Sequence, residues 1–118
     1  MIGLIEVVVV ALLLTNECGS NKQENIAIAS TVYNRAEHNS LSIFEVLHKE
    51  HQYHYRVKKV IARLKERGCK SFYNKLNYAI FAYGKGRKPY NHYCALYVFP
   101  KWSSGSKTIG KHKFKTIK

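Results

Sequence analysis

Residues 4–38 read LIEVVVVALLLTNECGSNKQENIAIASTVYNRAEH, and this stretch decides the fold. It joins a long apolar run to a second helical pattern through a short polar turn. The apolar run predicts a buried first helix over residues 2–16, and Gly19 follows as the signal that ends it. The fold therefore starts from two consecutive helices with Glu17 at the turn between them.

Two further segments have the spacing of helix N-terminal capping boxes. Ser20-Asn-Lys-Gln23 predicts a second helix over residues 24–38, and Ser42-Ile-Phe-Glu45 predicts a short third helix over residues 43–49. The second helix would turn one apolar stripe toward the core. That stripe consists of Ile26, Ala29, Tyr33 and Ala36.

The remaining chain changes from helical to β-prone patterns. Residues 55–67 predict an amphipathic basic helix ended by Gly68, and residues 71–83 predict another helix. Residues 93–99 are β-prone, and residues 107–117 alternate weakly. We therefore expect an α+β fold, mainly helical, with a small antiparallel β element near the C-terminus.

Composition supports one folded domain over residues 1–118. The chain is 46% hydrophobic and 13% aromatic, far from the composition of disordered chains. A length of 118 residues fits a single core.

The charge is strongly positive. Twenty Lys and Arg residues face seven acids, for a net charge of +13, which favours anionic partners such as nucleic acid, anionic lipid or wall polymers. All seven acids are Glu, which excludes mechanisms that demand an Asp nucleophile or Asp metal ligand. A small nucleic-acid-binding protein or nuclease is the alternative from another class, because residues 56–59 and 63–67 are basic. A membrane-active protein ranks third.

Three cysteines without a CxxC pair do not predict a disulfide framework, and they favour synthesis in a reducing cytoplasm. The apolar N-terminal run has no basic residue before it and no small-residue cleavage site after it. We expect a buried helix there rather than a cleaved signal peptide.

Glu17 is the leading candidate for acid chemistry. It follows the most apolar run of the chain and precedes a Cys-Gly turn, so it should emerge from the core at a cleft. Glu24 is the nearest rival, but its place on the second helix beside the predicted capping box favours a surface role or a helix-dipole role.

The order of several motifs resembles the SleB/CwlJ type of cell-wall hydrolase. The family's helix ends in a catalytic Glu and leads through a Gly-containing loop into an A-x-A-x-x-x-x-N-R helix, and residues 17–35 here read ECGSNKQENIAIASTVYNR. Residues 42–53, SIFEVLHKEHQY, resemble its T-I-x-x-V-I…Q-F element. Residues 95–102, ALYVFPKW, and 109–114, IGKHKF, resemble its A-x-Y-F-x-N-P…I-G-x-H-x-F ending.

The resemblance implies a lysozyme-like catalytic domain that cuts the glycan strands of peptidoglycan, and it carries the acid/base role onto Glu17. Two positions depart from the family pattern. Ser20 replaces a second Glu within a loop that is one residue shorter, and Phe99 replaces Asn before Pro100. This chain therefore lacks the family's second acid at that position and one polar side chain that could contact sugar.

Cleavage of a glycosidic bond needs a proton on the leaving oxygen, and a carboxylic acid supplies it near neutral pH where an apolar setting raises its pKa. Hydrolysis usually uses a second carboxylate, whereas in lytic transglycosylation the 6-hydroxyl of muramic acid attacks and one acid suffices. A chain poor in acids fits the second scheme better, although both outcomes remain open.

A sugar cleft needs aromatic faces together with amide or hydroxyl groups. The candidate substrate-binding residues are Gln52, Tyr53, Tyr97, Trp102 and His112. Core packing is an equal alternative for both tyrosines, Gln52 fits a solvated loop equally well, and a structural role is the alternative for His112.

The remaining expectations concern ligands and cellular role. His48, His51 and His54 are spaced three apart, but these positions drift round a helix and predict no metal site. We expect a monomer without cofactor that acts on peptidoglycan, with anionic wall polymers or outer-membrane lipid as further partners and no nucleic acid. A phage lysis enzyme (endolysin), made in the cytoplasm and acting on the wall after release, is the preferred interpretation, and a virion-borne wall-piercing enzyme comes next.

Overall fold

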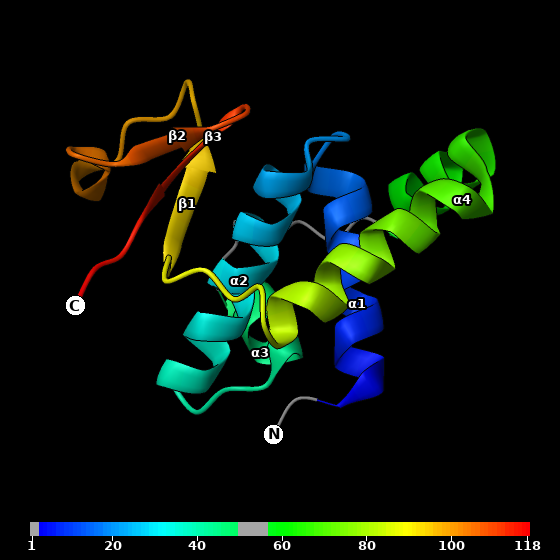
Figure 1. The fold of residues 1–118 in the computed structure, drawn as a ribbon, viewed down its shortest axis with the longest axis horizontal. Coiled ribbons are helices and arrows are strands. Elements are labelled where there is room, and N and C mark those ends of the chain that lie inside the picture. The colour runs from blue at the N-terminus through cyan, green and yellow to red at the C-terminus, as the bar shows by residue number, and fades with distance from the viewer. Residues whose placement is uncertain (1–2, 50–56) are drawn as a thin grey trace.

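The computed structural model describes residues 3–49 and 57–118, with the side chains of residues 17, 48, 49, 57–61, 63, 64 and 67–69 outside that description. Within these ranges, helices fill most of the chain and a three-stranded antiparallel sheet follows them (Figure 1). The expected mainly helical α+β class is confirmed. The elements are α1 (Leu4–Glu17), α2 (Lys22–His38), α3 (Ile43–Lys49), α4 (Val57–Tyr83), β1 (His92–Ala95), the 3-10 helix η1 (Lys101–Ser103), β2 (Lys107–Ile109) and β3 (His112–Lys115).

The apolar run forms α1 and supplies much of the core, as expected. Val10, Ala11 and Leu14 are fully buried, whereas Leu4 in its first turn is exposed. The acid within the run has a structural role, because Glu6 Oε2 accepts a hydrogen bond of 2.9 Å from the backbone N–H of Ile43 at the start of α3. A carboxylate is favourable at a helix N-terminus, so this contact ties α3 to α1.

The second helix is more central than one apolar stripe implies. It packs against α1, α3, α4 and β1, and every residue from 24 to 33 is buried. The polar side chains among them are satisfied by backbone groups. Thr31 donates to the Ala27 carbonyl at 2.8 Å, and Tyr33 donates to the Ala79 carbonyl in α4 at 2.9 Å.

The N-terminus of α2 differs from the expectation, whereas that of α3 confirms it. Asn21, not Ser20, is the N-cap of α2, and its side chain accepts a 3.0 Å hydrogen bond from the backbone N–H of Glu24. At α3 the predicted box forms: Ser42 N donates to Glu45 Oε1 at 3.0 Å, and Glu45 N donates to Ser42 Oγ at 3.1 Å.

The prediction of two helices separated at Gly68 is wrong, because α4 runs without a break from Val57 to Tyr83. Glycine in a helix interior costs only about 1 kcal/mol. Apolar residues recur at helical spacing in the sequence both before and after Gly68, and α4 packs against α1 and α2. Tertiary packing therefore outweighs the local helix-stop signal.

The connection from α4 to β1 is fixed by Asn34 of the Asn-Arg pair. Its Nδ2 donates to the carbonyls of Lys88 and Tyr90, each at 2.7 Å, and its Oδ1 accepts from Arg87 Nη1 at 3.1 Å. Arg87 also donates to the Ala82 carbonyl near the C-terminal end of α4 at 2.7 Å. This helix end is thus bound to α2.

The sheet has the order β1-β3-β2, so the last strand is central. Tyr93 pairs with Phe114, and Lys107 pairs with Phe114 from the other side. The β-prone stretch 93–99 forms a strand only as far as Ala95, and the chain then turns. Tyr93 and Phe114 are buried, which packs this face of the sheet against the helical body.

The assignment of Asn21 as the N-cap of α2 can be tested by substitution. Asn21→Ala should lower the free energy of unfolding by about 1 kcal/mol because the Glu24 amide loses its acceptor. Ser20→Ala, one residue earlier, should change it by less than about 0.5 kcal/mol. Urea unfolding of both variants measures the difference, and a larger loss in the Ser20 variant would contradict the assignment.

Candidate functional site

Glu17 is the last residue of α1, at the position that the sequence predicts. The helix ends there because Cys18, the C-cap, adopts an extended backbone, while its N–H still bonds the Leu14 carbonyl at 3.0 Å. The side chain of Glu17 lies outside the described residues. Its backbone position is set by the turn that follows, and the contacts of that turn define the site.

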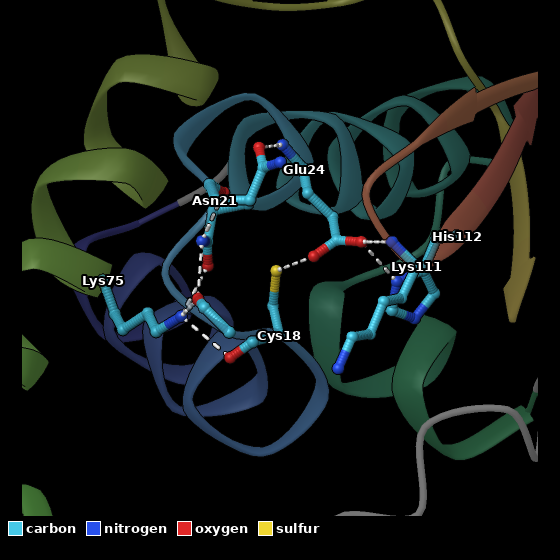
Figure 2. A network of polar contacts seen from close by, with 8 residues as sticks. Cys18, Asn21, Glu24, Lys75, Lys111 and His112 are labelled. Atoms are coloured by element: carbon cyan, nitrogen blue, oxygen red, sulfur yellow. Dashed lines mark hydrogen bonds and ion pairs between the residues drawn. The ribbon is translucent and has the colours of Figure 1, made fainter.

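Glu24 is buried, with 4% of its surface exposed, so a surface role is wrong, whereas its place in the first turn of α2 agrees with the helix-dipole alternative. Its Oε1 accepts a 3.1 Å hydrogen bond from the Cys18 thiol. Its Oε2 lies 3.0 Å from His112 Nδ1 and accepts a short hydrogen bond from the backbone N–H of Lys111 (Figure 2). The β2–β3 turn covers the start of α2, and this burial could not be read from the local sequence.

These donors keep Glu24 ionised. Burial by itself would raise the pKa of Glu24, but the hydrogen bonds from His112, the Cys18 thiol and the Lys111 amide outweigh it and lower the pKa below its usual value. An ionised carboxylate only accepts hydrogen bonds, so the proton between the two side chains resides on His112 Nδ1. The other ring nitrogen of His112, Nε2, takes no part in the contact with Glu24.

Gly110 makes the close approach of the turn possible. Its φ is +60°, a left-handed conformation that favours glycine, and a Cβ atom built there would collide with the Glu24 carboxylate. The glycine of the Ile109-Gly110-Lys-His112 motif thus brings the Lys111 amide and the His112 ring onto one carboxylate.

Lys75 holds the same turn from the opposite side. Its ammonium, on a side chain of α4 that is 3% exposed, donates to the Cys18 carbonyl at 2.9 Å, to Asn25 Oδ1 at 2.8 Å and to the Gly19 carbonyl. Asn25 Nδ2 in turn donates to the Gly19 carbonyl at 3.0 Å and the Asn21 carbonyl at 2.8 Å. The residues after Glu17 are thus fixed on both sides.

Cys18 has a structural role in this arrangement and is not a nucleophile. Burial and the neighbouring Glu24 carboxylate raise the pKa of its thiol far above the usual value. The side chain is therefore a neutral thiol whose hydrogen points at Glu24. In Figure 2 the thiol faces Glu24 and His112, whereas the carbonyl of the same residue faces Lys75.

Three of the predicted substrate-binding residues line one cavity of about 310 Å³: Tyr97, Trp102 and His112. We call it the aromatic cavity. Tyr97 is 83% exposed, and the half-buried Trp102 ring lies 5.2 Å from the His92 ring. The alternative prediction that Tyr97 packs in the core is thus wrong. The other lining residues are Tyr93, Cys94, Ala95, Val98 and Pro100.

Two other candidates, Gln52 and Tyr53, lie outside the described residues, as do His51 and His54. Among the residues that the structure describes, no three His, Cys or Glu side chains are placed to hold a metal ion. In the same part of the chain, no helix is long and apolar enough to span a membrane.

A second cavity, of about 570 Å³, lies between the turn after Glu17 and one face of α4. We call it the polar groove, because most of its lining side chains carry hydroxyl, amide or ammonium groups. The groove is lined by Gly19, Ser20, Ser71, Asn74, Lys75 and Tyr78.

The roles of two charged residues that organise the site were not identified from the sequence. Glu24 is the rival candidate acid, but two of its partners lie 87 and 88 residues away, and no local pattern indicates them. For Lys75 a signal existed, since a lysine lies within the apolar stripe formed by Phe72, Leu76 and Ala79. A cation in such a stripe is buried only where several acceptors meet it.

Comparison with protein-family models, with curated proteins and with solved structures finds no match to this chain. The chemistry of the turn and its two cavities therefore carries the functional argument.

Gly110→Ala should reduce stability through both the strained backbone and the clash with Glu24. We expect a loss of about 2 kcal/mol or more in the free energy of unfolding. Gly105→Ala is the matched control: Gly105 also has a positive φ, +75°, but the nearest atom to its added Cβ is Lys115 Nζ at 4.0 Å. It should lose about 1 kcal/mol. Equal losses in denaturant unfolding would exclude close packing against Glu24.

The lowered pKa of Glu24 predicts a specific acid sensitivity. A carboxyl whose folded pKa lies below the usual value, near 4.5, adds stability above pH 4.5 and loses it as the pH falls through the folded pKa. Glu24→Gln should be less stable at neutral pH and should lack this part of the acid loss. Urea unfolding from pH 7 to pH 3 tests it, and parallel profiles for the two proteins would contradict an ionised Glu24.

Proposed function

We propose that this chain is a peptidoglycan-cleaving glycosidase with a lysozyme-like catalytic domain, in which Glu17 is the general acid/base. The observation that carries the proposal is the turn after Glu17, which is held between Glu24 and Lys75 and is linked through Glu24 to His112 of the aromatic cavity. A fixed turn at the end of a buried helix holds an acid in one place, which is what proton transfer to a positioned leaving oxygen requires. The resemblance to the SleB/CwlJ type supports the same residue.

The aromatic cavity suits a pyranose ring. Tyr97 and Trp102 offer aromatic faces to the apolar CH face of a sugar, and His112 Nε2 offers a polar group to a hydroxyl. Because His112 Nδ1 is held by Glu24, the ring cannot turn freely, and Nε2 keeps its direction. His112 has a structural contact on one side and lines the cavity on the other.

The state of Glu24 favours transglycosylation over hydrolysis. A second catalytic carboxylate must reach water or the sugar, but both oxygens of Glu24 accept hydrogen bonds from the protein and the side chain is buried. It is therefore poorly placed to activate water or attack the anomeric carbon. A mechanism with one acid/base, in which the muramic acid 6-hydroxyl attacks, fits this site better. A phage lysis enzyme is the biological role we favour.

Glu17→Gln should abolish cleavage of purified peptidoglycan while leaving the fold intact. Mass analysis of the released muropeptides should find 1,6-anhydromuramic ends with the wild type, and reducing ends would indicate a hydrolase. Glu66→Gln, at an exposed position of α4, is the matched control and should retain activity. Circular dichroism and thermal unfolding confirm that each variant is folded. An active Glu17→Gln variant would refute the assignment, and an inactive wild type would make nucleic-acid binding the next hypothesis.

A further inference from the structure

The polar groove lies on the side of the Glu17 turn that the proposed function does not use. One wall is formed by Gly19 and Ser20, two and three residues after Glu17. The other wall is a single stripe of α4 with the helical spacing i, i+3, i+4 and i+7, namely Ser71, Asn74, Lys75 and Tyr78. Its volume of about 570 Å³ lies within the usual range for small-ligand sites.

The two cavities differ in chemistry. Aromatic side chains and apolar atoms dominate the lining of the aromatic cavity, which suits a sugar face. The polar groove instead presents two serine hydroxyls, the Asn74 amide and the Tyr78 hydroxyl above a buried ammonium. Such groups pair with the amides of a peptide backbone and with the carboxylates of its acidic side chains and C-terminus.

The electrostatics of the groove favour an anionic ligand. Lys75 lines it and contributes its positive charge, while its N–H groups are held by protein oxygens, and Lys70, the residue before Ser71, is exposed on the same helix. The whole chain carries a charge of +13, so the surrounding potential is positive. A peptide that carries free carboxylates matches this groove better than a neutral sugar does.

The turn residue Cys18 connects the two cavities. Its thiol binds Glu24, whose partner His112 lines the aromatic cavity, and its carbonyl binds Lys75, which lines the polar groove (Figure 2). The residue that follows Glu17 therefore lies between one lining residue of each cavity, Lys75 and His112. Peptidoglycan combines groups suited to both cavities, since its muramic acid units carry acidic peptide stems.

The geometry points to the polar groove as the binding site for the acidic peptide stem of peptidoglycan. This inference rests on the proposed function, because it assigns one part of that substrate to a second cavity. The enzyme then distinguishes peptide-bearing strands from bare glycan, and Asn74 and Ser71 determine that specificity.

Isothermal titration calorimetry with defined fragments tests the site without relying on cleavage. The ligands are a GlcNAc-MurNAc-peptide fragment, the same disaccharide without its peptide, and the free peptide. The first fragment ends at MurNAc and lacks the MurNAc-GlcNAc bond, so the wild-type protein can be used. The variants are Asn74→Ala and its matched control Asn77→Ala, at an exposed position of α4 that is not among the groove-lining residues.

We expect the peptide-bearing fragment to bind more tightly than the bare disaccharide. Asn74→Ala should weaken that binding roughly three- to tenfold through one lost hydrogen bond, with no change for the bare disaccharide. Asn77→Ala should bind like the wild type. Raising the salt concentration should weaken binding of the peptide-bearing fragment more than that of the disaccharide.

Three results would overturn the inference: equal affinity for the fragments with and without peptide, equal loss of both in Asn74→Ala, or no difference between the Asn74 and Asn77 variants. These results are independent of the cleavage assay. A protein that cleaves peptidoglycan but fails this test keeps the proposed function and loses the peptide site. One that binds the peptide-bearing fragment selectively but cleaves nothing loses the enzyme assignment and keeps the site.

Discussion

The burial of one ionised carboxylate constrains the whole molecule. Glu24 reaches donors from three parts of the chain: the Cys18 thiol after α1, the Lys111 amide in the β2–β3 turn, and the His112 ring in β3. A buried charge is tolerated only when hydrogen bonds replace its lost hydration, so these donors must all be in place together. The position of the sheet on the helices follows from that requirement.

Lys75 imposes a matching constraint of opposite charge. It cannot be buried unless carbonyl and amide oxygens surround it, and the turn after α1 supplies two of the three. Cys18 lies between the two buried charges and serves both, through its thiol and its carbonyl. The short loop is thereby held through two groups of one residue, the thiol and the carbonyl of Cys18, and such preorganisation is what the proposed acid at the end of α1 would need.

Sequence patterns correctly predicted the structural features that depend on residues close together in the chain. The apolar run of α1, the capping box at Ser42 and the helical class all depend on residues a few positions apart. Gly68 led to a wrong helix boundary. Its local stop signal is outweighed by the packing of a 27-residue helix whose apolar residues recur at helical spacing on both sides of it. Ser20 misled because Asn21 next to it caps equally well.

For the candidate site, the sequence indicated the aromatic cavity but not the charges that organise it. Tyr97, Trp102 and His112 were recognisable as residue types suited to sugar, and they come together. The contact of Glu24 with His112, like that of Asn34 with Tyr90, joins segments far apart in the chain. Such contacts cannot be predicted from a single sequence, since no residue pattern in one segment indicates which distant segment it will contact.

The distribution of the acids adds a last argument for Glu17. Glu6 binds the start of α3, Glu24 anchors the β2–β3 turn, Glu37 pairs with Arg87 at 3.0 Å, and Glu45 completes the α3 capping box. Each of these carboxylates is engaged by protein donors. Glu66 is exposed on α4, away from the lining of either cavity, and Glu50 lies outside the described residues. Glu17 stands directly before the turn that lines the polar groove and that contacts Glu24, the partner of His112 in the aromatic cavity, so its backbone position suits the acid of the proposed reaction.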